Sequence, residues 1–202
     1  MSRHFTGDTI ALVPAIHDET APGDLELVRT FINTADLQRH TDAVSTPETL
    51  RAWLAEHELL DATATVTPHE LARAANVREA LRELAGCEDC AECADEALRT
   101  LAEAAARAPL ALAFGRDRKL RLEPIDRGVD GAMARLLAIV HRAVENGDWP
   151  RLKLCKDEGC RWAFFDHSKN RSGAWCDMAT CGNRNKARRR RATAGSSGGS
   201  AG

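Results

Sequence analysis

Over the first three quarters of the chain, hydrophobic residues recur every three or four positions, and short polar segments separate these stretches. Such a period places the hydrophobic side chains on one face of an α-helix. Similar helical patterns cover residues 94–107 and about 130–146, where Gly147 is well placed to end the helix. The first predicted helix follows Asp24, which can cap it, and its hydrophobic positions are Leu25, Val28, Phe31, Ile32 and Ala35.

Two more helices have recognisable start signals, Ser45-Thr46-Pro47-Glu48 and Thr67-Pro68-His69-Glu70. Each string places hydroxyl and proline residues shortly before a glutamate. In the first string we expect Ser45 to cap the helix and Glu48 to complete a capping box, with Pro47 in the first turn. The second helix is predicted to run towards Leu84.

Two short stretches alternate instead of following a helical period. Leu110, Leu112 and Phe114 alternate with smaller residues, whereas Leu120 and Leu122 alternate with charged residues. A turn over residues 115–119 lies between them, so we predict one β-hairpin. Residues 9–13 could form a further strand. The predicted fold class is α+β, mainly α with a small β-hairpin.

Four cysteines near the C-terminus form two pairs of identical spacing. Four residues separate Cys155 from Cys160, and four separate Cys176 from Cys181. A tetrahedral zinc ion prefers four thiolate or imidazole ligands, which two such pairs can supply. We therefore predict that a helical N-terminal domain is followed by a small four-cysteine zinc finger. This zinc site would be closed and structural.

Other interpretations of these four cysteines remain open. They could be buried free thiols, two disulfides or an iron–sulfur cluster, and His167 could replace one of the ligands. Disulfides do not suit a chain with no evident signal peptide. Two symmetric pairs favour zinc over an iron–sulfur cluster. His167 is predicted to be a surface residue of the loop between the pairs.

A second group of cysteines forms the string C-x-x-C-x-x-C, at Cys87, Cys90 and Cys93. This group could be a thiol switch or a metal site, or simply part of a loop between two helices. The acidic residues Glu88, Asp89 and Glu92 disfavour thiolates, so they reduce the reactivity that a switch would need. The sequence leaves this choice open.

The charge of the chain is unevenly distributed. The net charge is −2, but residues 150–192 contain twelve Lys and Arg against four Asp and Glu, which leaves an acidic remainder. Such asymmetry is typical of an acidic body that carries a basic segment for a polyanion. Contact with nucleic acid should therefore be confined to one end of the molecule.

The basic segment is predicted to be a helix that starts near residues 181–183 and continues through Arg191. Arginine can pair with guanine and asparagine with adenine, whereas lysine and arginine also bind phosphates. Arg184 or Asn185 would then read bases, although Arg184 could equally hydrogen-bond within the finger. The candidate nucleic-acid-binding residues are Arg184, Asn185, Lys186, Arg188, Arg189, Arg190 and Arg191.

From Cys155 to Lys186 the chain reads C-x-x-x-x-C-x-W-x-F-F-D-x-S-x-N-R-S-x-x-W-C-x-M-x-x-C-G-N-R-x-K. This string resembles the CGNR zinc finger. Residues 25–34, 50–54 and 147–152 are similar to the ABATE domain of bacterial stress-induced transcriptional regulators, which usually precedes such a finger. The resemblance implies an ABATE-like sensing or dimerisation domain over 1–148 and the finger over 149–192. Residues 193–202, TAGSSGGSAG, are predicted from their composition to form a disordered tail.

The resemblance, together with the basic helix, implies a zinc-dependent DNA-binding transcriptional regulator that responds to stress or to a ligand. The alternative is a protein- or RNA-interaction module in which the finger is structural and the basic run binds an acidic partner. The sequence contains no nucleotide-binding glycine motif, nucleophile elbow or paired carboxylates in a pocket-like context, so we do not expect an enzyme.

The expected partners are double-stranded DNA, a second copy of the chain and a small-molecule effector. The polar pair Asn33 and Thr34 could line a pocket for such an effector, or hydrogen-bond locally to a neighbouring loop. No apolar run approaches the roughly 20 residues of a membrane helix. The odd number of cysteines, seven, suits a reducing compartment. We therefore expect a cytoplasmic protein without a membrane partner.

Overall fold

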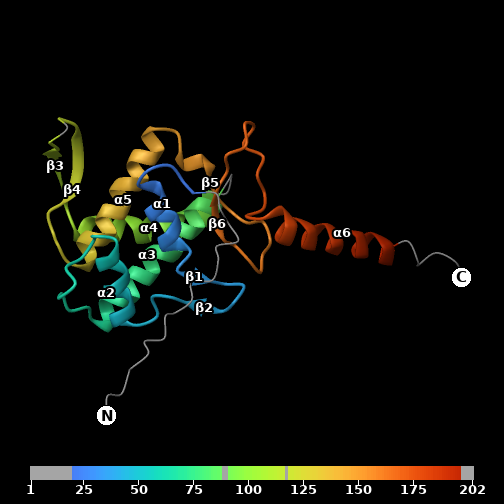
Figure 1. The fold of residues 1–202 in the computed structure, drawn as a ribbon, viewed down its shortest axis with the longest axis horizontal. Coiled ribbons are helices and arrows are strands. Elements are labelled where there is room, and N and C mark those ends of the chain that lie inside the picture. The colour runs from blue at the N-terminus through green and yellow to red at the C-terminus, as the bar shows by residue number, and fades with distance from the viewer. Residues whose placement is uncertain (1–19, 88–90, 117, 197–202) are drawn as a thin grey trace, which may run out of the picture.

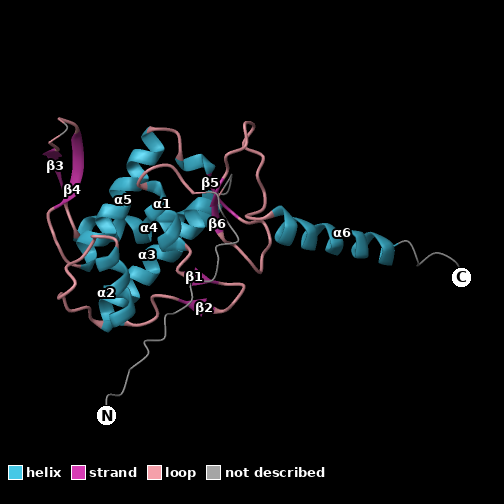
Figure 2. Cartoon of the chain, viewed as in Figure 1, coloured by secondary structure: helices cyan, strands magenta, loops and turns pink. Residues whose placement is uncertain are grey.

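The computed structural model describes residues 20–87, 91–116 and 118–196. Most of these residues form a bundle of helices, from which one further helix projects (Figures 1 and 2). The five helices of the body are α1 (Leu25–Ile32), α2 (Pro47–Glu56), α3 (Pro68–Gly86), α4 (Ala91–Arg107) and α5 (Val129–Glu145). The projecting helix is α6 (Asn183–Ser196).

Three antiparallel two-stranded sheets accompany the helices in the described part of the chain. They pair β1 (Ala35–Asp36) with β2 (Thr41–Asp42), β3 (Leu110–Phe114) with β4 (Leu120–Pro124), and β5 (Leu152–Leu154) with β6 (Ala163–Phe165). The hairpin β3–β4 is the predicted one. The α+β fold class is therefore confirmed. The strand predicted over residues 9–13 lies outside the described residues.

Capping boxes determine where helices α2 and α3 begin. Thr67 accepts a hydrogen bond from the Glu70 backbone N–H, and the Glu70 carboxylate accepts one from the Thr67 N–H at 2.8 Å. The box predicted at α2 is displaced by one residue, because Thr46 and Thr49 form it instead of Ser45 and Glu48. Pro47 occupies the first helical position, so the residue directly before it becomes the cap.

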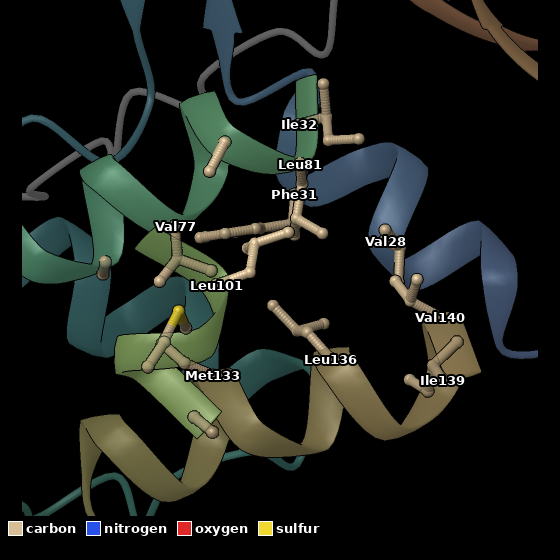
Figure 3. Packing of buried hydrophobic residues seen from close by; sticks show 14 of the residues in the cluster. Val28, Phe31, Ile32, Val77, Leu81, Leu101, Met133, Leu136, Ile139 and Val140 are labelled. Atoms are coloured by element: carbon tan, nitrogen blue, oxygen red, sulfur yellow. The ribbon is translucent and has the colours of Figure 1, made fainter. Parts of the chain in front are cut away.

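The hydrophobic core lies between α1, α3, α4 and α5. Val28, Leu81 and Leu136 are fully buried there, and side chains from all four helices converge on the same space (Figure 3). Strands β5 and β6 belong to the same cluster through Leu152, Leu154, Ala163 and Phe165. The start of the cysteine-containing segment is therefore packed into the core of the helical body.

Helix α3 and strand β5 approach each other closely at Gly86. A Cβ atom at this position would lie 2.8 Å from Cδ1 of Leu154, which is too close for any side chain. Glycine at the end of α3 therefore allows Leu154 to enter the core. Leu154 immediately precedes Cys155, so this contact positions the first of the four cysteines.

A buried arginine also connects the body to the cysteine-containing segment. Arg82 is 1 % exposed, and its guanidinium donates to the carbonyl oxygens of Ile32 at 2.6 Å, Ala35 at 3.0 Å and Arg161 at 3.2 Å. Its Nε atom pairs with Glu79 at 2.9 Å. A buried charge is stable only when its donors are satisfied. Arg82 therefore fixes the end of α1 against the residue that follows Cys160.

Candidate metal centre

Each cysteine pair is held by a short turn that an aspartate organises. In the first turn, the Cys160 N–H donates to the Asp157 carbonyl oxygen at 2.8 Å. In the second, the Asp177 side chain accepts from the Thr180 N–H at 2.9 Å and caps the π-helical turn Met178–Gly182. The Gly182 N–H then donates to the Asp177 carbonyl oxygen. The four-residue spacing is therefore closed by local hydrogen bonds in both pairs.

The two turns bring the sulfur atoms of all four predicted ligands together. Those of Cys155, Cys160, Cys176 and Cys181 all lie within 4.8 Å of one another. The separation is 3.6 Å between Cys160 and Cys176 and 3.8 Å between Cys176 and Cys181. Four sulfurs at about 2.3 Å from a tetrahedral zinc ion would be about 3.8 Å apart. The observed separations fit such a site.

His167 is not part of this cluster. It is exposed, its Nε2 atom lies 3.0 Å from the Thr20 carbonyl oxygen, and its ring packs edge-on against Phe165. Within the described residues, the cluster that can hold a metal thus consists of four cysteines, and three of them, Cys155, Cys160 and Cys181, are buried. This donor set is typical of a structural zinc site with no position left for a substrate.

The four sulfurs cannot all ionise without a cation. Hydrogen bonds from Cys160 and Cys176 lower the pKa of the Cys155 thiol to about 2, whereas the hydrogen bond to Cys155 raises the pKa of Cys160 to about 12. Burial raises the pKa of Cys181. One thiolate is therefore stabilised by protons on its neighbours. A divalent cation would replace those protons, so metal binding should release them.

Asp157 lies between the first two cysteines and connects this turn to α6. It is 0 % exposed, and its carboxylate accepts from Asn185 Nδ2 at 2.9 Å. The guanidinium groups of Arg184 and Arg188 lie 3.5 Å and 3.4 Å from the same carboxylate. The Gly159 N–H adds a fourth contact at 3.2 Å. A buried carboxylate with these partners holds the base of α6 against the metal site.

Burial divides the predicted nucleic-acid-binding residues into two groups, although Arg188, which is exposed, contacts Asp157 as well. Arg184 and Asn185 are half-buried, and Arg184 also lies 3.1 Å from Gln38 Oε1 and 3.7 Å from Cys181 Sγ. Lys186, Arg189, Arg190 and Arg191 are exposed along α6, as is Arg188. Sequence reasoning did not identify Asp157. The sequence shows Asp157 only as an acidic residue between two predicted metal ligands, and its role becomes clear only once its hydrogen-bond partners are known.

Gly182 marks the junction between the last ligand and α6. A Cβ atom there would lie 2.8 Å from Met178 Sδ and 3.3 Å from Trp175. Trp175 in turn packs against the cysteine cluster, as does Trp162. A side chain at position 182 would therefore have to displace the exposed end of Met178 and would press against Trp175.

The loop between the cysteine pairs is organised by Asp166. Its carboxylate pairs with Lys153 Nζ at 3.1 Å and accepts from the N–H groups of Ser168 and Gly173 at 2.9 Å and 2.8 Å. Burial acts to raise the pKa of Asp166, but the hydrogen bonds from Ser168, Lys153 and Gly173 prevail and lower it to about 2. Asp166 therefore organises the turn that contains Ser168 and Gly173.

Asn33 makes a further connection between the body and the cysteine-containing segment. Its side-chain Oδ1 accepts from the Ala163 N–H and its Nδ2 donates to the Ala163 carbonyl oxygen, both at 2.8 Å. The local hydrogen bonding expected of this polar pair is made by Thr34 alone, which donates to Phe31 O. Asn33 instead reaches a strand 130 residues further along the chain. Both polar ends of the Asn33 amide are therefore occupied by β6.

The structure describes only part of the second cysteine group, which consists of Cys87, Cys90 and Cys93. Cys87 is half-buried at the end of α3, and α4 begins at Ala91, so position 93 is helical and not part of the loop. Cys90 and the side chain of Cys93 lie outside the described residues. Among the residues that are described, the four finger cysteines are the one cluster of three or more potential metal ligands.

Family models match most of the chain. Residues 25–146 match ABATE, described as "Putative stress-induced transcription regulator", and residues 151–194 match the CGNR zinc finger. No curated protein matches the chain. Neither family description is that of an enzyme. None of the described helices is long and apolar enough to span a membrane.

Proposed function

Because this chain belongs to the ABATE family and carries a CGNR zinc finger after the ABATE domain, we propose that it is a zinc-dependent transcription regulator that binds double-stranded DNA through α6. The observation that carries this proposal is a basic helix that projects from an otherwise acidic molecule (Figure 1). An α-helix fits the major groove of DNA, and arginine and lysine on its surface can contact the flanking phosphates.

The exposure of the side chains on α6 suggests how these residues divide the work of binding DNA. We assign phosphate binding to Lys186 and to residues 188–191, whose side chains are exposed. Arg184 and Asn185 were candidates for reading bases, and both contact Asp157. In our proposal they chiefly orient the helix. Binding would then depend more on phosphates than on base sequence, and its affinity would fall steeply with salt.

Zinc has a structural role in this proposal. The four cysteine sulfurs would hold the zinc ion, and its double positive charge would allow all four thiols to ionise. Residues of the chain position the helix, because Asp157 connects α6 to the first cysteine turn and Asn33 connects β6 to the body. The helix would therefore point in a direction that the body determines.

The helical body would provide the regulatory input. We propose that the ABATE-like part over 1–148 dimerises and responds to a small-molecule effector, while the finger over 149–192 contacts DNA. A single finger of this size seldom gives enough affinity, so two copies acting together are expected. A regulator of this kind would act in the cytoplasm, where bacterial DNA lies.

Neutralising the outer part of α6 is the test of this proposal. We expect the triple variant Arg189→Gln, Arg190→Gln, Arg191→Gln to lose about three phosphate contacts, because these side chains are exposed near the end of the helix. The log–log salt slope for binding a random duplex should change from roughly −4 to −5 to roughly −1 to −2. Fluorescence anisotropy at several salt concentrations measures both the affinity and the slope.

The matched control changes the same charge on the body. The triple variant Arg99→Gln, Arg107→Gln, Arg127→Gln also removes three exposed arginines, but none lies on α6. It should bind DNA as the unchanged protein does. Equal loss in both variants, or no loss in the α6 variant, would contradict the assignment. Binding of single-stranded RNA or an acidic protein in preference to duplex DNA would favour the alternative function.

A further inference from the structure

The hairpin β3–β4 exposes hydrophobic side chains far from the metal site. Leu112 is 69 % exposed, Phe114 80 % and Leu120 54 %, which is unusual for side chains of this size. The hairpin stands at the opposite end of the molecule from α6 (Figure 1). A partner bound there would leave both the finger and the basic helix accessible.

One edge of this hairpin lacks a strand partner in the described part of the chain. Strand β3 pairs with β4 on one side, and β4 lies against α5. The free edge of β3 has the sequence Leu110-Ala111-Leu112-Ala113-Phe114, with no charged residue and no proline. Soluble proteins usually protect such edges with charges, prolines or bulges. An uncharged, exposed edge is therefore suited to pair with another strand.

The alternation along the hairpin separates its two faces. Leu110, Leu112 and Phe114 point to one face, together with their partners on β4, which are Pro124, Leu122 and Leu120 in register. A groove of about 740 Å³ lies between the hairpin and α5, and its lining combines apolar residues such as Leu112, Leu122 and Ile139 with charged ones that include Arg121 and Glu123. The opposite face carries Ala111 and Ala113 opposite Glu123 and Arg121.

We propose that β3 pairs antiparallel with β3 of a second copy of this chain, with the two-fold axis at Leu112. The two hairpins would then form one continuous four-stranded sheet in the order β4, β3, partner β3, partner β4. Backbone hydrogen bonds across the new edge would hold the pair together, and the apolar faces of both hairpins would join into one surface beside the two α5 helices.

A two-fold axis at Leu112 matches apolar side chains with one another. Leu112 would face the partner's Leu112, and Phe114 would face the partner's Leu110. Cross-strand aromatic and aliphatic pairs of this kind stabilise antiparallel sheets. Because side chains alternate with a period of two, a shift by one residue would place alanine where leucine is needed, so the sequence favours this register.

The charges on the other face are also complementary under the same symmetry. Ala113 would lie opposite the partner's Ala111, which places Arg121 and the partner's Glu123 at the two ends of one row across the sheet. Adjacent strands are about 4.8 Å apart. Because this row spans three such spacings, about 14 Å, Arg121 and the partner's Glu123 attract each other across the alanines without touching. The two-fold axis generates this attraction twice.

These observations favour a second copy over other occupants of the surface. A strand of another protein would need apolar residues and charges in the same order as this hairpin. A second copy of the chain has that order, and a two-fold axis closes the interface between the two copies. The arrangement also gives the two-fold symmetry that DNA binding by paired fingers requires, but it does not depend on zinc or on DNA. Its test is therefore separate from the test of the proposed function.

The test measures the oligomeric state of the full zinc-loaded chain by sedimentation equilibrium without DNA. We expect the unchanged protein to be a dimer and the variant Leu112→Arg to be a monomer, with a dissociation constant raised at least about 100-fold, because two like charges would face each other at the axis. Leu98→Arg is the control, since Leu98 is 48 % exposed on α4 and lies outside the hairpin.

A mixing experiment distinguishes loss of the interface from loss of the fold. Leu112→Glu alone should also be monomeric, whereas an equimolar mixture with Leu112→Arg should form a heterodimer through opposite charges at the axis. A monomeric unchanged protein, a dimer that survives Leu112→Arg, or a mixture that stays monomeric would overturn the proposal. So would a monomer in the Leu98→Arg control, because the interface would then lie elsewhere.

Discussion

Replacing Cys181 by serine is expected to abolish zinc retention and DNA binding while leaving the helical body folded. Cys181 is 2 % exposed and lies in the π-helical turn that leads into α6, so its sulfur joins the metal site to the basic helix. Structural zinc contributes about 10–16 kcal/mol over four ligands, so the loss of one ligand should weaken zinc binding at least about 100-fold. Metal analysis after dialysis against a chelator, together with duplex binding, measures both effects.

The control for this substitution is Cys87→Ser. Cys87 is a half-buried cysteine at the end of α3, and its sulfur is not in the four-cysteine cluster. This variant should keep its zinc and its affinity for DNA. If Cys181→Ser retained zinc as firmly as Cys87→Ser does, the last ligand would have been assigned wrongly.

The second large effect is expected at Asn33. The isosteric change Asn33→Asp removes the N–H donor to the Ala163 carbonyl oxygen and places two acceptors against each other in a buried position. An unsatisfied buried group with a charge should lower the free energy of unfolding by about 3 kcal/mol at pH 7. Urea denaturation followed by circular dichroism measures this loss. Zinc should also be released to a chelator more rapidly, because β6 is no longer held to α1.

The pH dependence of this variant is diagnostic. Burial beside a carbonyl raises the pKa of the introduced carboxyl group above its value in the unfolded chain. The protonated form can donate to the Ala163 oxygen, so stability is retained below the unfolded pKa and is lost as the pH rises through the folded one. The control Asn146→Asp changes an exposed residue at the end of α5 and should show neither effect. Equal destabilisation of both variants would contradict the role of Asn33.

The sequence predicted those parts of the site that depend on short-range patterns. The four cysteines follow a ligand spacing that two local turns can close, and the basic helix begins where it was expected, at Asn183. The hairpin was predictable because alternation and a turn occur in one short stretch. Even the displaced box at α2 differed by a single residue, because two hydroxyl residues precede Pro47 and the pattern does not say which one caps.

The connections that position the site were not predictable in the same way. Asn33 contacts Ala163, Arg82 contacts Arg161, and Asp157 contacts Asn185. Each pair joins segments that only the complete fold brings together, and the type of residue does not identify its partner. Asn33 could have lined a pocket, and Arg184 could have read a base. In the structure Asn33 hydrogen-bonds to Ala163, and Arg184 lies 3.5 Å from the buried Asp157 carboxylate.

The most direct test of the account is to measure zinc content together with the labelling of individual cysteines by an alkylating agent. We predict one zinc ion per chain and protection of Cys155, Cys160, Cys176 and Cys181 while the ion is bound. Once a chelator removes the zinc, mass spectrometry should find all four labelled. Protein that contains no zinc after purification in its presence, or sulfurs that react at the same rate with and without the ion, would contradict the central claim.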